Sequence, residues 1–154
     1  MSDDLELLTV KVQRILAEYL SDVRLSDKGG FMVPYESTMV VVSPRQMDEE
    51  RTAVVLFALM NQNVPATPEL FKWVATNTDE YMFGHIGLHM LEGDDTKCNL
   101  VFSHTLLGDY LDPEELRSAI GAVATTANHL DDEVQDRFGG ERWADPSTVR
   151  TDRQ

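Results

Sequence analysis

The run TAVVLFALMNQ, residues 52–62, constrains the fold of this chain more than any other segment. Its apolar side chains are consecutive, as in a strand that lies inside a sheet and is buried on both faces. A buried helix is the competing interpretation. However, a helix would place these side chains all around its circumference. The consecutive order of these apolar residues therefore favours a central strand.

Helical and strand patterns alternate along the rest of the chain. Residues 4–20 carry apolar side chains at helical spacing. The segment FMVPYESTMVVVSP, residues 31–44, fits two strands joined by a turn at YES. The segments at 81–91 and 97–107 flank EGDDT and fit a β-hairpin with an acidic tip.

Two further helices begin with the same combination of residues. Thr67 and Asp112 can cap backbone N–H groups, and a proline follows each of them at the first helical position. The second of these helices ends at Gly139, where a glycine suits the left-handed cap. The sequence therefore predicts helices from Thr67 and from Asp112, the latter reaching about Phe138.

The predicted element order is α-β-β-β-α-β-β-α. This order indicates an α+β fold, an antiparallel sheet packed with helices, and not a parallel nucleotide-binding sheet. Residues 1–140 form one predicted domain, which is an ordinary length for a single core. Residues 141–154 are polar and form a predicted flexible tail, from which Trp143 could fold back onto the body.

The register of the predicted hairpin separates its side chains into two faces. If the tip is a loop of about three or five residues, alternation along the strands gives one apolar face. That face carries Ile86, Leu88, Met90, Cys98, Leu100 and Phe102. The second face carries His85, His89, Asn99, Val101 and Ser103.

Composition excludes several classes of partner. Thirteen Lys and Arg against 27 Asp and Glu give a net charge of −14, which repels nucleic acid and anionic membranes. No uncharged stretch reaches the ~20 apolar residues of a membrane-spanning helix. The acidic N-terminus is unlike a secretory signal, and the single cysteine, Cys98, suits a reducing compartment, so we expect a cytoplasmic protein. Cys98 is predicted to be packed and unreactive.

Carboxylates and one histidine gather near the C-terminus, in NHLDDEVQDRFGG, residues 128–140. A helical wheel places His129, Asp132 and Asp136 together, opposite the apolar stripe of Leu130 and Val134. Their spacing is compatible with a metal ion but supplies no second helix of ligands. A solvated helix face is the favoured interpretation. No metal, cofactor or catalytic residue is predicted.

The apolar residues of the sheet raise a separate question. Three helices can suffice to cover it, or they can leave apolar surface exposed. In the second case the exposed surface would serve as a dimer interface or as a groove for an extended or amphipathic segment.

Four segments, TPELFKWVAT, YMFGHIGL, HTLLGDYLDPEEL and HLDDEVQDRFGG, together with the element order, resemble the YbjN-like family. That family is similar in fold to the class I effector chaperones of type III secretion. The resemblance extends over residues 5–140. It implies a small, acidic, non-enzymatic, usually dimeric protein that holds a segment of a client polypeptide.

The sequence therefore predicts a peptide-binding chaperone or adaptor. Its client contacts are predicted at His85, His89 and Val101, on the second face of the hairpin. A dimeric regulatory protein in signal transduction is the first alternative. A metal-dependent enzyme that uses the acidic C-terminal helix is a remote one.

Overall fold

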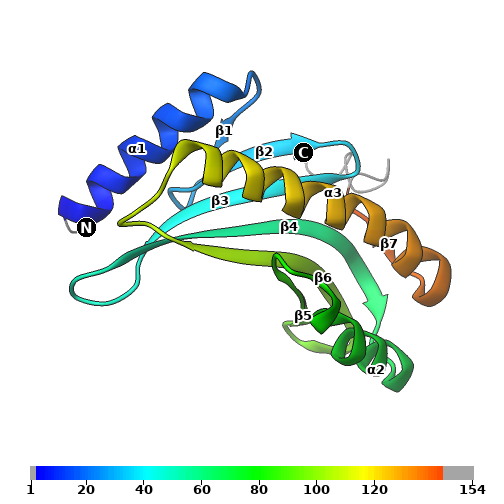
Figure 1. The fold of residues 1–154 in the computed structure, drawn as a ribbon. Helices are drawn as coiled ribbons and strands as arrows, with labels where there is room; N and C mark the ends of the chain where they lie inside the picture. The colour runs from blue at the N-terminus through cyan, green and yellow to red at the C-terminus, as the bar shows by residue number, and fades with distance from the viewer. Residues whose placement is uncertain (1–2, 144–154) are drawn as a thin grey trace.

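The computed structural model describes residues 3–143, which form three helices and an antiparallel sheet (Figure 1). The helices are α1 (Asp3–Tyr19), α2 (Pro68–Asn77) and α3 (Pro113–Phe138), with a 3₁₀ turn η1 (Thr78–Glu80). The strands are β1 (Arg24–Leu25), β2 (Phe31–Tyr35), β3 (Thr38–Gln46), β4 (Thr52–Pro65), β5 (His85–Leu91), β6 (Asp94–Leu107) and β7 (Glu141–Arg142).

The sheet has the order β1-β2-β3-β4-β6-β5, and all its pairs are antiparallel. The predicted α+β class and the order of the main elements are confirmed. The sequence did not reveal the two-residue strands β1 and β7 or the turn η1. Such short elements have too few residues to show a period.

Strand β4 is interior to the sheet, as predicted, but the prediction that it is buried on both faces was wrong. Val54, Leu56 and Met60 are fully buried beneath the helices. Phe57 and Leu59 alternate with them and are only partly buried. The helices α1 and α3 lie side by side across the first face (Figure 1). The opposite face, which we call the helix-free face, has no helix of the described chain packed across it, and only Leu5 at the start of α1 lines a groove beside Val41 and Phe57.

The β5–β6 hairpin has the predicted register. Ile86 pairs with Phe102, Leu88 with Leu100, and Met90 with Cys98. The tip differs, because a bulge after Met90 lets Leu91 pair with Asp94 across a two-residue turn. Cys98 is fully buried, and burial raises the pKa of its thiol. The structure thus confirms a packed cysteine.

Both predicted helix starts are confirmed. The Thr67 side chain accepts a hydrogen bond from the backbone N–H of Leu70. The Asp112 carboxylate accepts hydrogen bonds from the N–H groups of Glu114 and Glu115. Gly139 follows α3 as predicted, but its φ of 88° and ψ of −155° lie outside the predicted left-handed cap conformation, in a region that glycine adopts at little cost.

The chain returns to the sheet after α3. Glu141 pairs with Gln62 and Arg142 with Asn61, and the Trp143 N–H donates to the Met60 carbonyl at 3.0 Å. The first three residues of the predicted tail therefore lie against β4. The prediction for the rest of the tail, 144–154, lies outside the described residues.

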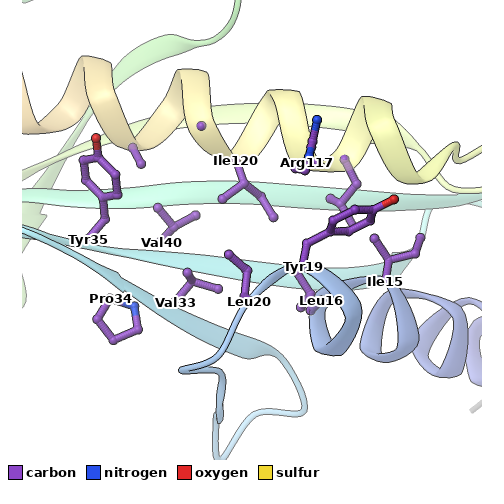
Figure 2. A pocket seen from close by; sticks show the side chains of 13 residues that line it. Ile15, Leu16, Tyr19, Leu20, Val33, Pro34, Tyr35, Val40, Arg117 and Ile120 are labelled. Atoms are coloured by element: carbon purple, nitrogen blue, oxygen red, sulfur yellow. The ribbon is translucent and has the colours of Figure 1, made fainter.

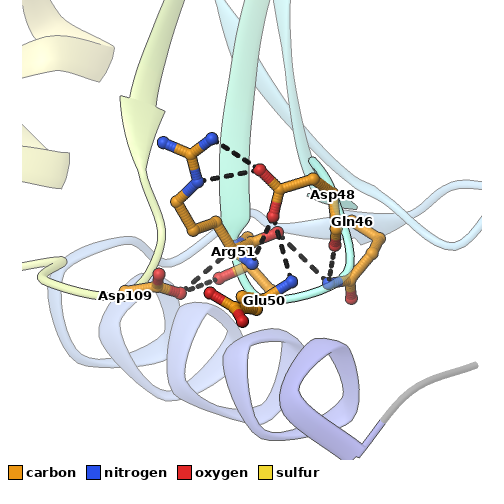
Figure 3. A network of polar contacts seen from close by, with 6 residues as sticks. Gln46, Asp48, Glu50, Arg51 and Asp109 are labelled. Atoms are coloured by element: carbon orange, nitrogen blue, oxygen red, sulfur yellow. Dashed lines mark hydrogen bonds and ion pairs between the residues drawn. The ribbon is translucent and has the colours of Figure 1, made fainter.

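Polar contacts fix the β3–β4 turn and connect it to the segment before α3 (Figure 3). The Arg51 guanidinium binds Asp48 within the turn and lowers the pKa of that carboxyl. The Thr52 hydroxyl donates to Asp109 at 2.8 Å. This last contact joins the start of β4 to the connection that leads into α3.

A buried carboxyl connects α3 to the β2–β3 turn. Asp131 on α3 is fully buried, and burial raises its pKa. The Ser37 hydroxyl lies 2.5 Å from Asp131 Oδ2 and also contacts Asn128 Oδ1. One hydroxyl proton cannot serve both acceptors. If Asp131 is protonated, it donates to Ser37, which then donates to Asn128, so the geometry favours the neutral acid.

We expect Asp131 to make the fold less stable as pH rises. A carboxyl whose pKa is higher in the folded chain stabilises it fully below the ordinary value of 3.8, and this stabilisation is lost as pH rises through the folded-state pKa. Between the ordinary pKa and the folded-state pKa, the free energy of unfolding falls by up to about 1.4 kcal/mol for each pH unit. The substitution Asp131→Asn supplies an amide donor at the same place and should abolish the loss. Urea unfolding of both chains at several pH values measures the difference, and a pH-independent difference would contradict the assignment.

Candidate functional site

An apolar cleft of about 250 Å³ lies between α1, α3 and the strands β2 and β3 (Figure 2). We call it the α1–α3 cleft. Its lining residues are Ile15, Leu16, Tyr19, Leu20, Val33, Pro34, Tyr35, Val40, Leu116, Arg117, Ile120, Gly121 and Ala124. Arg117 is the only charged residue among them, so the cleft favours apolar side chains.

Small residues on α3 keep this cleft open. Gly121 and Ala124 present little or no side chain to it. A Cβ added at Gly121 would meet no atom within 4 Å. The two helices therefore do not close on each other at this point, although Ile15 and Ile120 contribute to one core below them.

The space at Gly121 leads to a stability prediction. We expect Gly121→Ala to stabilise the chain by about 0.5–1 kcal/mol, because alanine restricts the unfolded backbone without a clash. Gly108→Ala is the matched control, since its Cβ would lie 2.7 Å from Leu8 Cδ2 and also too close to the Thr52 hydroxyl. That variant should be destabilised. Thermal unfolding compares them, and a Gly121→Ala chain less stable than the parent would show that the cleft is closed there.

A cation lies at the rim of the cleft. The Arg117 guanidinium lies beside the Tyr19 ring (Figure 2), 5.1 Å from its centre. It also binds Glu114 at 2.7 Å. The hydrogen bond to Glu114 raises the pKa of Arg117, which stays charged. Tyr19 and Arg117 are both exposed. The two side chains join α1 to α3 by a surface contact that a bound chain could displace.

The residues predicted to contact a client lie elsewhere. Val101 is partly buried on the helix-free face, and exposed His85 and His89 lie on the same face. The pairs Gly87↔Val101, His85↔Ser103 and His89↔Asn99 bring them together on neighbouring strands. The α1–α3 cleft is on the opposite side of the sheet. Client contact at these three residues therefore stays a prediction.

The helix-free face is apolar well beyond the hairpin. Cross-strand pairs join Met32 to Val41, Val41 to Phe57, and Leu59 to Val101. All five of these side chains are partly buried in the single chain, and none carries a charge. A chain with a net charge of −14 thus has an uncharged apolar sheet surface.

The α1–α3 cleft was not predicted from the sequence. The apolar stripes of its two helices were visible, but no local signal shows that these stripes stay apart. Gly121, a helix-destabilising residue beside that stripe, is the one signal that could have suggested a gap.

The acidic end of α3 is solvated. His129, Asp132 and Asp136 are exposed, and Asp132 accepts a hydrogen bond from Arg142 at 2.7 Å. Across residues 3–143, no group of three or more His, Cys, Asp or Glu side chains is arranged to hold a metal ion. Asp131, which follows Leu130, lies apart from this cluster in the core.

None of the helices within residues 3–143 combines the length and the apolar character needed to cross a membrane.

Residues 6–146 match a family model described as "T3SS (YopN, CesT) and YbjN peptide-binding chaperone 1". The matched range includes both the α1–α3 cleft and the helix-free face. No curated protein matches the chain.

Proposed function

The chain belongs to the family of type III secretion and YbjN peptide-binding chaperones, and on that premise we propose that it holds a client segment in the α1–α3 cleft, without bond chemistry. One observation supports the cleft as the client-binding surface. The cleft is hollow, almost wholly apolar and open beside Gly121. Apolar side chains of a client would be removed from water there.

The size of the cleft fits a polypeptide client. At about 250 Å³ it is smaller than the ~300–1,000 Å³ of small-molecule sites. It accommodates one or two large apolar side chains of a segment that runs along the groove between the helices. Burying each such side chain is worth about 1.5–3 kcal/mol. The acidic surface would attract a segment with basic flanks.

The helix-free face supports two further parts of the proposal. We propose that a second copy of the chain covers its centre, around Val41 and Phe57. The groove beside these two residues is lined by Lys28 and Arg45 and by no carboxylate, so two acidic chains can meet there with little repulsion. His85, His89 and Val101 lie toward the hairpin side of the same face, where we propose an additional client contact. The buried Cys98 thiol suits a cytoplasmic location.

Site-specific crosslinking tests where the client binds. A photoreactive phenylalanine analogue replaces Tyr19 at the rim of the cleft in one chain and exposed His89 in another. Mass spectrometry after irradiation in cells should map the Tyr19 crosslinks to one segment of one protein. Crosslinks that scatter over many proteins, or a single segment reached only from His89, would refute the assignment of the cleft.

A further inference from the structure

Strand β6 extends beyond its hairpin partner. The last pair between β5 and β6 is His85↔Ser103. Residues 104–107 continue as strand and pair with β4, from Leu56↔His104 to Ala53↔Leu107. No strand within residues 3–143 pairs with their other side. These four residues therefore form a free edge of the sheet, which we call the β6 edge.

The ladder shows which backbone groups of the β6 edge point outward. The Gly108 N–H donates to the Thr52 carbonyl at 2.8 Å, so it points toward β4. Backbone groups alternate in direction along an antiparallel strand. Those of Leu106 therefore point toward β4 as well, and those of Thr105 and Leu107 point away from it. Both of these residues are exposed.

Apolar side chains surround this edge. Phe83, Leu107 and Tyr110 line a groove there and are 53%, 52% and 82% exposed. The Phe83 ring lies 5.4 Å from the His104 ring, beside this groove of about 580 Å³ between the β6 edge and the start of α3. Exposed edges are usually protected by charge or proline. Residues 104–107 contain neither a lysine nor a proline.

Charge identifies the kind of occupant. Glu115 on α3 lines the groove, and Asp79 and Glu80 come shortly before Met82 in the chain. In a symmetric contact, a second copy would place its own Glu115 against the same groove, whereas no carboxylate lines the surface around Val41 and Phe57 where a second copy is proposed to bind. A basic segment instead gains electrostatically as it approaches.

We propose that the β6 edge binds an extended, basic polypeptide segment as an additional strand. The segment would hydrogen bond to the backbone of Thr105 and Leu107 and place alternate apolar side chains in the groove beside Phe83. This goes beyond the proposed function, because the surface is separate. Glu115 and Ala119 on α3 face this groove, whereas Leu116 and Ile120 face the α1–α3 cleft.

The test uses a synthetic probe and the full chain. The probe is a blocked eight-residue peptide in which threonine and valine alternate between two terminal lysines. Saturating probe should slow hydrogen exchange at the Thr105 and Leu107 amides by tenfold or more. The substitution Thr105→Pro should weaken probe binding by tenfold or more, because proline removes the outward N–H, and edge strands tolerate proline there.

Matched variants of probe and protein make the outcome decisive. A probe with terminal glutamates, or with N-methylated amides on the pairing side, should bind tenfold more weakly or worse to the parent chain. Gly121→Trp, which fills the α1–α3 cleft, should leave probe binding unchanged, so this proposal can fail or succeed apart from the proposed function. Equal binding of the lysine and glutamate probes overturns the inference. So does a parent dimer that Thr105→Pro converts to monomer, because the occupant would then be a second copy.

Discussion

Replacing Phe102 by alanine should destabilise the chain by about 3–5 kcal/mol, as expected for a large fully buried aromatic side chain. Phe102 is fully buried in the face of β6 that the helices cover. Its ring centre lies 5.2 Å from that of Tyr81, edge to face, and the partly buried Tyr81 packs against the core to which Phe102 belongs. Urea unfolding followed by circular dichroism measures the loss, which is a large part of a typical stability of 5–15 kcal/mol.

Phe57→Ala is the matched control for the opposite face. Phe57 pairs with Ser103, the neighbour of Phe102, but is only partly buried on the helix-free face. At low protein concentration this variant should lose only about 1 kcal/mol. The loss should grow at concentrations where the proposed dimer covers Phe57. Equal losses for the two variants at low concentration would contradict the one-sided arrangement of the helices.

Filling the α1–α3 cleft should abolish client binding while the fold remains. The substitution Gly121→Trp places a large side chain where an added Cβ meets no atom within 4 Å. It would occupy the volume proposed for one or two client side chains. Excluding one or two such side chains removes about 1.5–6 kcal/mol, so affinity should fall by at least about tenfold. Calorimetry with the synthetic client segment found by crosslinking measures this.

Asp136→Trp controls for the addition of a bulky aromatic residue to α3. Asp136 is exposed and does not line the α1–α3 cleft. This variant should bind the client segment as the parent does, and both tryptophan variants should unfold near the parent temperature. Undiminished binding by Gly121→Trp would exclude the cleft as the site.

The sequence predicted most of the fold because its local signals agree with one another. Capping at Thr67 and Asp112 set two helix starts, and two-residue alternation set the β5–β6 register through the pair Ile86↔Phe102. The consecutive apolar residues of β4 predicted an interior strand, yet they could not show that Phe57 would remain partly exposed. Which face the helices cover depends on packing between distant elements.

The sites were less predictable than the fold for the same reason. The α1–α3 cleft depends on how far apart two helices lie, a distance that neither helix encodes alone. Asp131 is buried because Ser37 and Asn128 lie beside it, and Ser37 comes from a turn that is far away in sequence. The acidic cluster of Asp132 and Asp136, whose spacing in the sequence is compatible with a metal ion, is exposed.

The central claim is that a client segment binds between α1 and α3, and intermolecular nuclear Overhauser effects test it most directly. The experiment uses methyl-labelled chain and the client segment identified by crosslinking. We expect contacts from the segment to the methyl groups of Ile15, Leu20 and Ile120, all of which line the cleft. Contacts confined to Val41 and Val101 on the helix-free face, with none to the cleft, would contradict the claim.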